Sequence, residues 1–325
     1  MRGVTLLAAG GTIAMASEAG APVTPGLDAD ALVAAVPGLA AYPDLAARTA
    51  DTRPGAQLDG AGALAIARAA ADAAGAGRGV VVTHGTDTLE ETAFLCDLLY
   101  GGDAPVVFTG AMRPATNPGA DGPANLLDAV ALASSAEAAG LGVLVCFAGE
   151  VHAARAVRKA DSAAPSAFAS PGAGPLGTVS EGRARIERRL ARREPLDVRS
   201  LDATVHVVSA GLAAAGELVD AAVGAAGADG LIAIALGAGH VSPGFLRALE
   251  RAAARVPVIA TVRPERGAIM RATYGFEGAE GDLRASGALC AAALSPAAAR
   301  VKLMACLGAG CDRAAIAAAF APDDR

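Results

Sequence analysis

The chain has 325 residues, of which 53% are hydrophobic, 18% charged and 3% aromatic, and its formal net charge is -6. This composition supplies a core of Ala, Val, Leu and Ile large enough for one large domain or two of ordinary size. The acidic balance and the lack of a basic stripe exclude a polyanion, and therefore nucleic acid, as the expected partner.

Short apolar runs alternate with helical patterns along the chain, which predicts parallel sheets covered by helices on both faces. The sequence predicts these elements in chain order: strand Val4–Ala9, helix Asp28–Val36, helix Gly60–Ala74, strand Gly79–Thr83, helix Leu89–Tyr100, strand Pro105–Thr109, helix Asn125–Ala136, strand Gly142–Phe147, strand Thr204–Val208, helix Glu217–Val223, strand Gly230–Leu236, helix Gly244–Ala253, strand Pro257–Thr261 and helix Pro296–Leu307.

A polar stretch from about Glu181 to Leu201 interrupts this alternation and is the best candidate for a linker. Its charged run, Arg183–Arg193, mixes arginines with glutamates and is typical of a solvated face or a domain connector. We therefore expect two α/β domains: residues 1–185 with a mainly parallel sheet, a linker over 186–202, and a smaller domain over 203–325.

The first apolar stretch, Val4–Ala9, is too short for a signal peptide, and no run approaches the ~20 apolar residues of a membrane span. The five cysteines are widely spaced, lack a metal-ligand pattern and are expected to be buried free thiols in a reducing compartment. These features predict a cytoplasmic protein with no metal, no cofactor and no membrane partner.

Two strand ends carry loops in which a threonine directly follows a glycine. They are Gly10-Gly11-Thr12 and His84-Gly85-Thr86-Asp87. Ligands bind beyond the carboxyl ends of parallel strands, and the backbone N–H groups of glycine loops can face a developing oxyanion. A threonine hydroxyl becomes a nucleophile when a base takes its proton, and a lysine can be that base when its surroundings lower its pKa. Asp87 offers a negative charge for a substrate ammonium or for orienting a lysine.

Structural explanations of the same residues remain open at this point. Gly10-Gly11-Thr12 is also compatible with a plain tight turn or with a degenerate nucleotide loop, although it lacks the spacing of G-x-G-x-x-G. Thr88 and Glu91 fit a helix capping box. His84 lies too close in sequence to the loop to need a triad role.

Longer motifs add a resemblance to the bacterial L-asparaginase family. Gly10-Gly11-Thr12-Ile13-Ala14 resembles its first signature, and the ten residues His84–Ala93 resemble its second signature almost residue for residue. The resemblance continues through further blocks to near the end of the chain: Gly110–Pro114, Ala120–Asp121–Gly122–Pro123 with Asn125–Leu126, Val157–Arg158–Lys159, Gly174–Gly177, Pro195–Val198 and Ala299–Val301. It implies amide hydrolysis through an acyl-enzyme.

The resemblance also implies a role for individual residues. Thr12 is expected to attack the side-chain amide carbon, Thr86 and Lys159 to form a proton relay, and Asp87 to act beside them while holding the substrate's α-ammonium. The implied substrate-binding residues are Gly11, Thr24, Gly55, Ala56, Gln57, Gly85, Asp87, Ala111 and Glu280. Ala111 is expected to lie against the substrate amide through its backbone.

Three positions depart from the family's common pattern. The loop Glu18–Gly26 lacks the family's tyrosine, so Thr24 is the candidate to supply a hydroxyl there. Ala56 stands where the family's carboxylate-binding serine is expected. Ala238 stands where the family has an asparagine that is donated across a subunit interface. Each lost hydrogen bond to a charged group costs ~1.5–3 kcal/mol, so affinity and selectivity are affected more than reaction type.

The function implied by the resemblance is hydrolysis of L-asparagine to L-aspartate and ammonia. Alternatives are a related amidohydrolase acting on glutamine or another small ω-amide, an asparaginase-like subunit of a tRNA-dependent amidotransferase, and a catalytically inactive binding protein. The retained Thr, Thr, Asp and Lys set disfavours the last, and the acidic charge disfavours the tRNA-dependent enzyme. Glu280 is expected to reach the substrate of a neighbouring subunit, so a homodimer or homotetramer with active sites at the interface is predicted.

Overall fold

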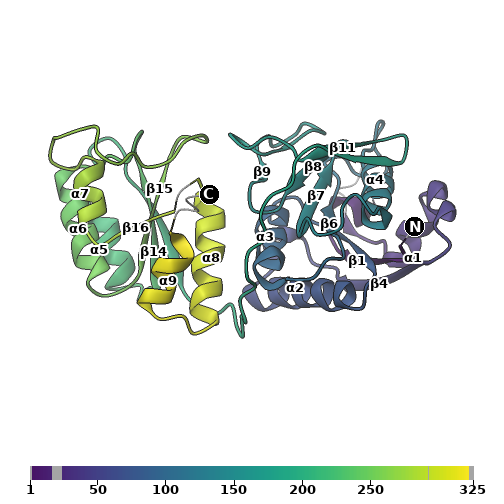
Figure 1. Cartoon of the computed structure of the whole chain (residues 1–325), viewed down its shortest axis with the longest axis horizontal. Helices are drawn as coiled ribbons and strands as arrows, with labels where there is room; N and C mark the ends of the chain where they lie inside the picture. Colours follow the sequence, from purple (N-terminus) through teal and green to yellow (C-terminus); the bar gives the residue numbers. More distant parts are fainter. Residues whose placement is uncertain (1, 17–23, 292, 322–325) are drawn as a thin grey trace. The chain divides into compact units, whose positions relative to one another are not determined.

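The computed structural model describes residues 2–16, 24–291 and 293–321, and of Ala16, Thr24 and Pro25 it describes the backbone. The chain divides into two compact units, Met1–Pro195 and Leu196–Arg325, each an α/β sandwich (Figure 1).

The first unit is built on an eight-stranded sheet with the strand order β12-β11-β8-β7-β6-β5-β1-β4. Strands β4, β1, β5, β6 and β7 run parallel, and β8, β11 and β12 extend the sheet antiparallel. The strands are β1 (Val4–Ala9), β4 (Leu45–Asp51), β5 (Gly79–His84), β6 (Val106–Thr109), β7 (Val143–Phe147), β8 (Glu150–Ala153), β11 (Gly177–Ser180) and β12 (Arg183–Ile186).

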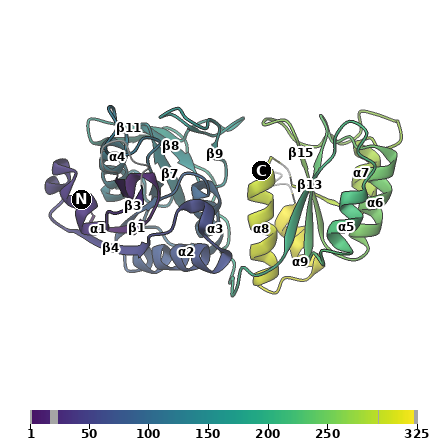
Figure 2. The same ribbon diagram turned by 180° about the vertical axis from the view of Figure 1, so that it is seen from behind.

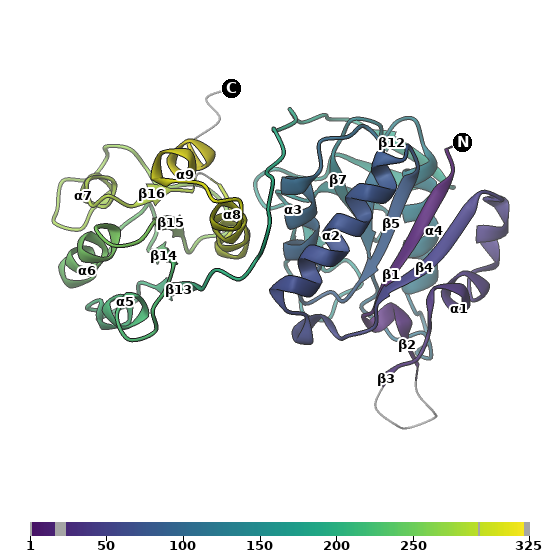
Figure 3. The ribbon, with the colours of Figure 1, turned by 90° about the horizontal axis from the view of Figure 1, so that it is seen from below.

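The central strands β1, β5, β6 and β7 are buried at every residue because helices cover both faces of the sheet. Figure 3 shows α2 and α3 on one face and α1 and α4 on the other. The helices of this unit are α1 (Ala29–Ala34), α2 (Gly60–Gly75), α3 (Leu89–Leu99) and α4 (Gly122–Ser134), with 3-10 turns η1 (Thr12–Ala14), η2 (Pro37–Ala41) and η3 (Gly55–Gln57). Asp28 and Asp59 begin α1 and α2 by accepting hydrogen bonds from the amides of Ala31 and Gly62.

Two small hairpins lie outside the main sheet. They are β2–β3 (Met15–Ala16 and Thr24–Pro25) and β9–β10 (Arg158–Lys159 and Phe168–Ala169). Each has two residues per strand and was not predicted from the sequence.

The second unit has a four-stranded parallel sheet with the order β13-β14-β15-β16. Helices α5, α6 and α7 lie on one face, and α8 and α9 lie on the other (Figures 1 and 2). The elements are β13 (Val205–Ser209), α5 (Glu217–Val223), β14 (Gly230–Ala235), α6 (Pro243–Ala253), β15 (Val258–Val262), α7 (Glu280–Ala285), β16 (Leu289–Cys290), α8 (Pro296–Gly308) and α9 (Arg313–Phe320).

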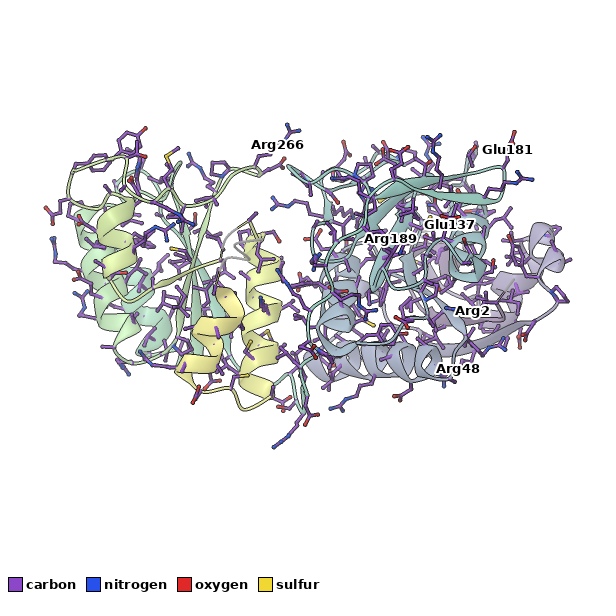
Figure 4. All side chains as sticks on the ribbon, viewed as in Figure 1. Arg2, Arg48, Glu137, Glu181, Arg189 and Arg266 are labelled. Atoms are coloured by element: carbon purple, nitrogen blue, oxygen red, sulfur yellow. The ribbon has the colours of Figure 1, made fainter. Side chains whose placement is uncertain are left out.

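These elements confirm the predicted two-domain α/β class, with a mainly parallel sheet in the larger unit. The expectation of an irregular connector from about Glu181 was wrong for Arg183–Ile186, which form the edge strand β12. Residues 187–204 carry no helix or strand, yet the arginines that follow β12 bind carbonyl groups of the first unit. Arg189 donates to the carbonyls of Ala139 and Glu137 at 2.9 and 2.8 Å; Figure 4 labels Arg189 and Glu137.

Candidate functional site

The predicted site residues of the first unit follow the carboxyl ends of neighbouring parallel strands. Thr12 follows β1, Thr86 and Asp87 follow β5, Ala111 follows β6, and Gly55 follows β4. Parallel strands end at the same edge of a sheet, so one edge collects these loops. The sheet order therefore explains how residues about 100 positions apart in the sequence reach one place.

Three glycines let these loops touch through their backbones. Gly11 has a φ of 85°, and a Cβ placed there would lie 2.5 Å from the Cα of Gly85. A Cβ on Gly85 would lie 2.9 Å from the amide nitrogen of Gly55. Only glycine permits this approach, so Gly11, Gly55 and Gly85 bring the Thr12 and Thr86 loops together. A plain tight turn after β1 does not explain this convergence.

Lys159 joins the site from the β9–β10 hairpin. Its Nζ donates to Thr86 Oγ1 at 2.9 Å and to Asp87 Oδ1 at 3.1 Å. Thr86 is buried, whereas the Asp87 side chain is 65% exposed. Thr86 thus lies inside the fold with the Lys159 amine on its hydroxyl, and Asp87 presents a side chain to solvent beside it. Thr12 is half-buried at the start of η1.

Glu90, which sequence reasoning passed over, contacts the same lysine. Its carboxylate accepts a hydrogen bond from the backbone N–H of Lys159. Burial raises the pKa of Glu90, while the Lys159 amide opposes the shift. The segment Thr86–Glu90 therefore holds both the ammonium group and the backbone of Lys159. The sequence motif could not reveal this contact because the donor is the backbone N–H of Lys159, which every residue type except proline also has.

The Thr88 hydroxyl does not cap α3, so the predicted capping box is wrong at this residue. Thr88 is the N-cap residue, but its side chain makes no cap hydrogen bond. Instead it donates to the carbonyl of Gly55 at 3.1 Å. The hydroxyl therefore ties the Thr86 loop to the loop after β4.

Ala111 is fully buried. The backbone of the residues before and after it is held by Asp121 and Asn125 at the start of α4. The Asp121 carboxylate accepts from the amides of Met112 and Arg113 at 3.0 and 2.8 Å. Asn125 Nδ2 donates to the carbonyl of Gly110 at 3.0 Å. In the sequence, Asp121 and Asn125 stand out only as part of a block that resembles the family. Their contacts fix the backbone on both sides of Ala111.

The remaining substrate-binding candidates of the first unit are more exposed. Gly55 is buried, while Ala56 and Gln57 are exposed at the edge of the site. Thr24 begins β3, where its backbone pairs with Ala16, but its side chain lies outside the described part, as do residues 17–23 of the loop Glu18–Gly26.

Glu280 belongs to the second unit and is fully buried there. Its Oε1 accepts from the amides of Thr273 and Tyr274, the latter at 2.9 Å, and its Oε2 lies 3.4 Å from His240 Nε2. Burial acts to raise the pKa of Glu280, but these amide hydrogen bonds and His240 hold it below its ordinary value. His240 was not singled out from the sequence, although it stands two residues after Ala238.

The two other neighbourhoods weighed from the sequence contribute no site residue. His84 is buried, its Nδ1 lies 2.9 Å from the Gly85 carbonyl, and burial lowers its pKa. All five cysteines are free, with Cys96, Cys146 and Cys306 buried and Cys290 and Cys311 half-buried. In residues 2–16, 24–291 and 293–321 no cluster of His, Cys, Asp and Glu has the arrangement of a metal site. Within the same ranges, each helix is too short or too polar to cross a bilayer.

Fold and site together define a two-domain α/β protein with a Thr–Lys–Asp cluster at the strand ends of its larger domain. The family model "Asparaginase, N-terminal" matches residues 3–192, and "Glutaminase/Asparaginase C-terminal domain" matches residues 204–320. The chain belongs to the asparaginase family.

Individual relatives agree with this assignment. The chain is 34% identical over 309 residues to a probable periplasmic L-asparaginase of Haemophilus influenzae, covering 92% of this chain and 87% of that protein. It is 38% identical over 251 residues to a probable L-asparaginase of Deinococcus radiodurans, covering 76% of each chain. The crystal structure of a probable cytoplasmic L-asparaginase from Campylobacter jejuni superposes with a TM-score of 0.86 at 30% identity, covering 98% of both chains.

Proposed function

We propose that the protein hydrolyses L-asparagine to L-aspartate and ammonia. The observation that carries the proposal is the contact of Lys159 Nζ with Thr86 Oγ1 beside Asp87, in a loop whose Gly85 touches Gly11 next to Thr12. Two threonine hydroxyls, one lysine amine and one carboxylate then share the strand-end edge of the sheet. Family membership supports the same reaction.

In this proposal Thr12 Oγ attacks the side-chain amide carbon of the substrate. The Thr12 proton leaves through the Thr86–Lys159 pair and is returned to the amide nitrogen, so that the C–N bond breaks and ammonia departs from an acyl-enzyme. Water then attacks the acyl carbon, its proton returns to Thr12 Oγ, and aspartate is released. The half-buried position of Thr12 and the buried Thr86 hydroxyl suit such a relay.

Substrate recognition is assigned to the surrounding loops. Asp87 presents a charge to the α-ammonium, while Gly11, Gly85 and the backbone of Ala111 surround the amide. Gly55, Ala56 and Gln57 contact the α-carboxylate, and Thr24 supplies a hydroxyl from the neighbouring hairpin. Because Ala56 has no hydroxyl, Gly55 or backbone N–H groups replace that contact.

Glu280 is proposed to complete the site in a homodimer or homotetramer by approaching the ammonium bound to a neighbouring subunit. Its pKa is already held low inside its own unit, so it is available as a carboxylate. Two carboxylates around one ammonium favour an α-amino substrate over a simple amide. The cytoplasm is the proposed compartment because all five cysteines are unpaired, which fits a reducing environment.

The principal alternative is hydrolysis of glutamine or another small ω-amide, because one extra methylene is worth only ~1–3 kcal/mol in a pocket. The matching C-terminal family model carries the glutaminase name as well. Ammonia release from L-Asn, D-Asn and L-Gln by the purified protein decides between them. Equal release from all three would contradict an asparagine-selective enzyme, and no release from any would contradict the proposed function.

A further inference from the structure

Lys159 stands on a weakly built element. Its hairpin, β9–β10, is a separate two-stranded sheet with two residue pairs, Lys159 with Phe168 and Arg158 with Ala169. A two-stranded hairpin of this size is at best marginally stable by itself. The position of the lysine therefore depends on what fastens the hairpin to the main sheet.

Besides the hydrogen bond from the Lys159 backbone to Glu90, two buried side chains in and after β10 fasten the hairpin. The Phe168 ring packs on Phe147 of β7 with a centroid distance of 4.7 Å. Ser170, the first residue after β10, has its Oγ 3.0 Å from Nδ1 of His152 on β8. His152 and Ser170 are 0% and 5% exposed, so water does not compete for this hydrogen bond.

Glu150 determines how the imidazole is protonated. Its Oε2 lies 3.2 Å from His152 Nε2, but the orientation is not that of a hydrogen bond, since Nε2 has no hydrogen-bond partner among the described residues. Burial lowers the pKa of His152 and Glu150 partly opposes that shift, so the ring is neutral near neutral pH. In the neutral ring, the tautomer with its proton on Nε2 is favoured by the nearby Glu150 carboxylate. Nδ1 then carries no proton and accepts a hydrogen bond from the Ser170 hydroxyl.

Ser170, His152 and Glu150 have the composition of a hydrolase triad, but Glu150 makes no oriented hydrogen bond to the imidazole, as the third member of a triad would. We propose that His152 is a positioning residue that acts through Ser170 to hold the β9–β10 hairpin and thereby Lys159. The consequence for turnover rests on the proposed function, in which Lys159 moves protons. The consequence for the geometry of Lys159 does not.

The energetic reason is the length of the lysine side chain. Its ammonium group reaches Thr86 and Asp87 at 2.9 and 3.1 Å from a backbone that the hairpin must hold still. Freeing the hairpin restores rotamer freedom to the lysine side chain and so weakens its hold on both acceptors. A displacement of ~1 Å at a reacting group costs about 100-fold in rate.

Two substitutions of the same histidine separate its two nitrogens. His152→Asn keeps an acceptor near the position of Nδ1, whereas His152→Gln keeps a polar atom near Nε2. We expect His152→Gln to lower kcat by about 10- to 100-fold with KM changed less than about threefold, and His152→Asn to retain most of kcat. Ser170→Ala should match His152→Gln, and the double variant should be no worse than either single one.

A second measurement reports on Lys159 without reference to activity. The sequence holds two lysines, Lys159 and Lys302. Lys302 is buried in the second unit, where its Nζ lies 4.9 Å from the Phe320 ring centre. Trace acetylation followed by peptide mass spectrometry gives the reactivity of Lys159 relative to Lys302 as internal reference.

We expect this ratio to change at least threefold in His152→Gln and Ser170→Ala and to stay near the wild-type value in His152→Asn. Asp161→Asn is the matched control, because Asp161 holds the turn of the same hairpin through the amides of Ala163 and Ala164 and the new side chain keeps an acceptor oxygen. An unchanged ratio in both His152→Gln and Ser170→Ala overturns the proposal. If the ratio changes in these two variants while the wild-type protein releases no ammonia, the positioning role is supported and only the proposed function is contradicted.

Discussion

At the scale of single residues, the site divides into groups that the sequence pattern revealed and groups that it could not reveal. Thr86, Asp87 and Lys159 lie in motifs resembling the family's signatures, and the structure brings these three together. Glu90 and His152 escaped notice because the partner of one is a backbone amide and the partner of the other is a serine 18 residues away. Such contacts depend on how the hairpin packs and leave no periodic trace in the sequence.

The nucleophile is tested by Thr12→Ala. Because Thr12 lies in a 3-10 turn after β1 and not in a strand, we expect the melting temperature to stay within about 2 °C while ammonia release falls by more than 1,000-fold. Thr178→Ala, an exposed threonine on β11, is the control and should retain full activity. A Thr12→Ala variant with more than about a tenth of wild-type turnover would exclude Thr12 as the nucleophile.

The two lysines should respond in opposite ways to the same substitution. Lys159→Met removes the donor to Thr86 and is expected to suppress kcat with a smaller effect on KM. Lys302→Met removes the Nζ hydrogen bond to the Ala319 carbonyl and is expected to lower the melting temperature while kcat is retained. Steady-state kinetics and calorimetry on both variants check this. If Lys159→Met raises only KM, the lysine binds substrate and the relay is wrong.

The raised pKa of Glu90 predicts how stability depends on pH. A carboxyl group with a raised pKa in the fold favours the protonated state, so its contribution is present below its ordinary pKa of about 4.3 and is lost as pH rises through the folded value. Glu90→Gln removes the cost of ionisation. Its melting temperature should therefore exceed that of the wild type most at pH 8, and the difference should shrink toward pH 4.

Calorimetry across that range, with the exposed Glu137→Gln as control, tests the sign. A Glu90→Gln variant that melts below the wild type at pH 8, with the gap closing toward pH 4, would show that ionised Glu90 is favoured by the fold.

At the scale of elements, continuous apolar runs were predicted well and edge elements poorly. β1 was predicted over Val4–Ala9 because all six residues are buried, as a central parallel strand requires. β4 was missed because exposed residues dominate it, and β12 because its residues Arg183–Ile186 read as part of a charged run. An edge strand faces solvent on one side, so its sequence resembles that of a loop.

The glycine contacts at the strand ends give a prediction at this scale. Gly11→Ala introduces a methyl group 2.5 Å from Gly85, so the Thr12 and Thr86 loops must separate, and we expect activity to be lost. Gly77 has the same φ of 85° but nothing within 4 Å of its would-be Cβ. Gly77→Ala should therefore cost only the conformational strain of about 1–2 kcal/mol and keep full activity. Equal effects of the two substitutions on activity would contradict the convergence of the loops.

At the scale of the whole molecule, each unit is a complete sandwich with its own core, and the active-site assignment draws residues from both. Thr12 and Glu280 are 268 positions apart in the sequence, which is the difference between their residue numbers. The proposal assigns them to one site formed between two chains. The subunit arrangement is therefore best tested by mixing.

If Glu280 serves the site of a neighbouring subunit, two impaired variants should restore each other. A mixed dimer of Thr12→Ala and Glu280→Gln chains has one site with both changes and one with neither. Co-expression should then recover a substantial part of wild-type turnover, although each variant alone is impaired. Light scattering of the same samples gives the oligomeric state. A mixture that shows only the average of its two components would place Glu280 outside the neighbouring site.

The scarcity of lysine has a practical side. Apart from an α-amino group, the chain offers amine-reactive reagents only Lys159 and Lys302, and Lys302 is buried. Among the lysines, polymer conjugation or attachment to an aldehyde-activated support would therefore be directed to the β9–β10 hairpin, which carries Lys159. Arginine, which makes up 25 of the 27 basic residues counted as Lys and Arg, is untouched by such reagents. Immobilising this protein through Lys159 should consume its activity in proportion to the fraction of Lys159 that is coupled.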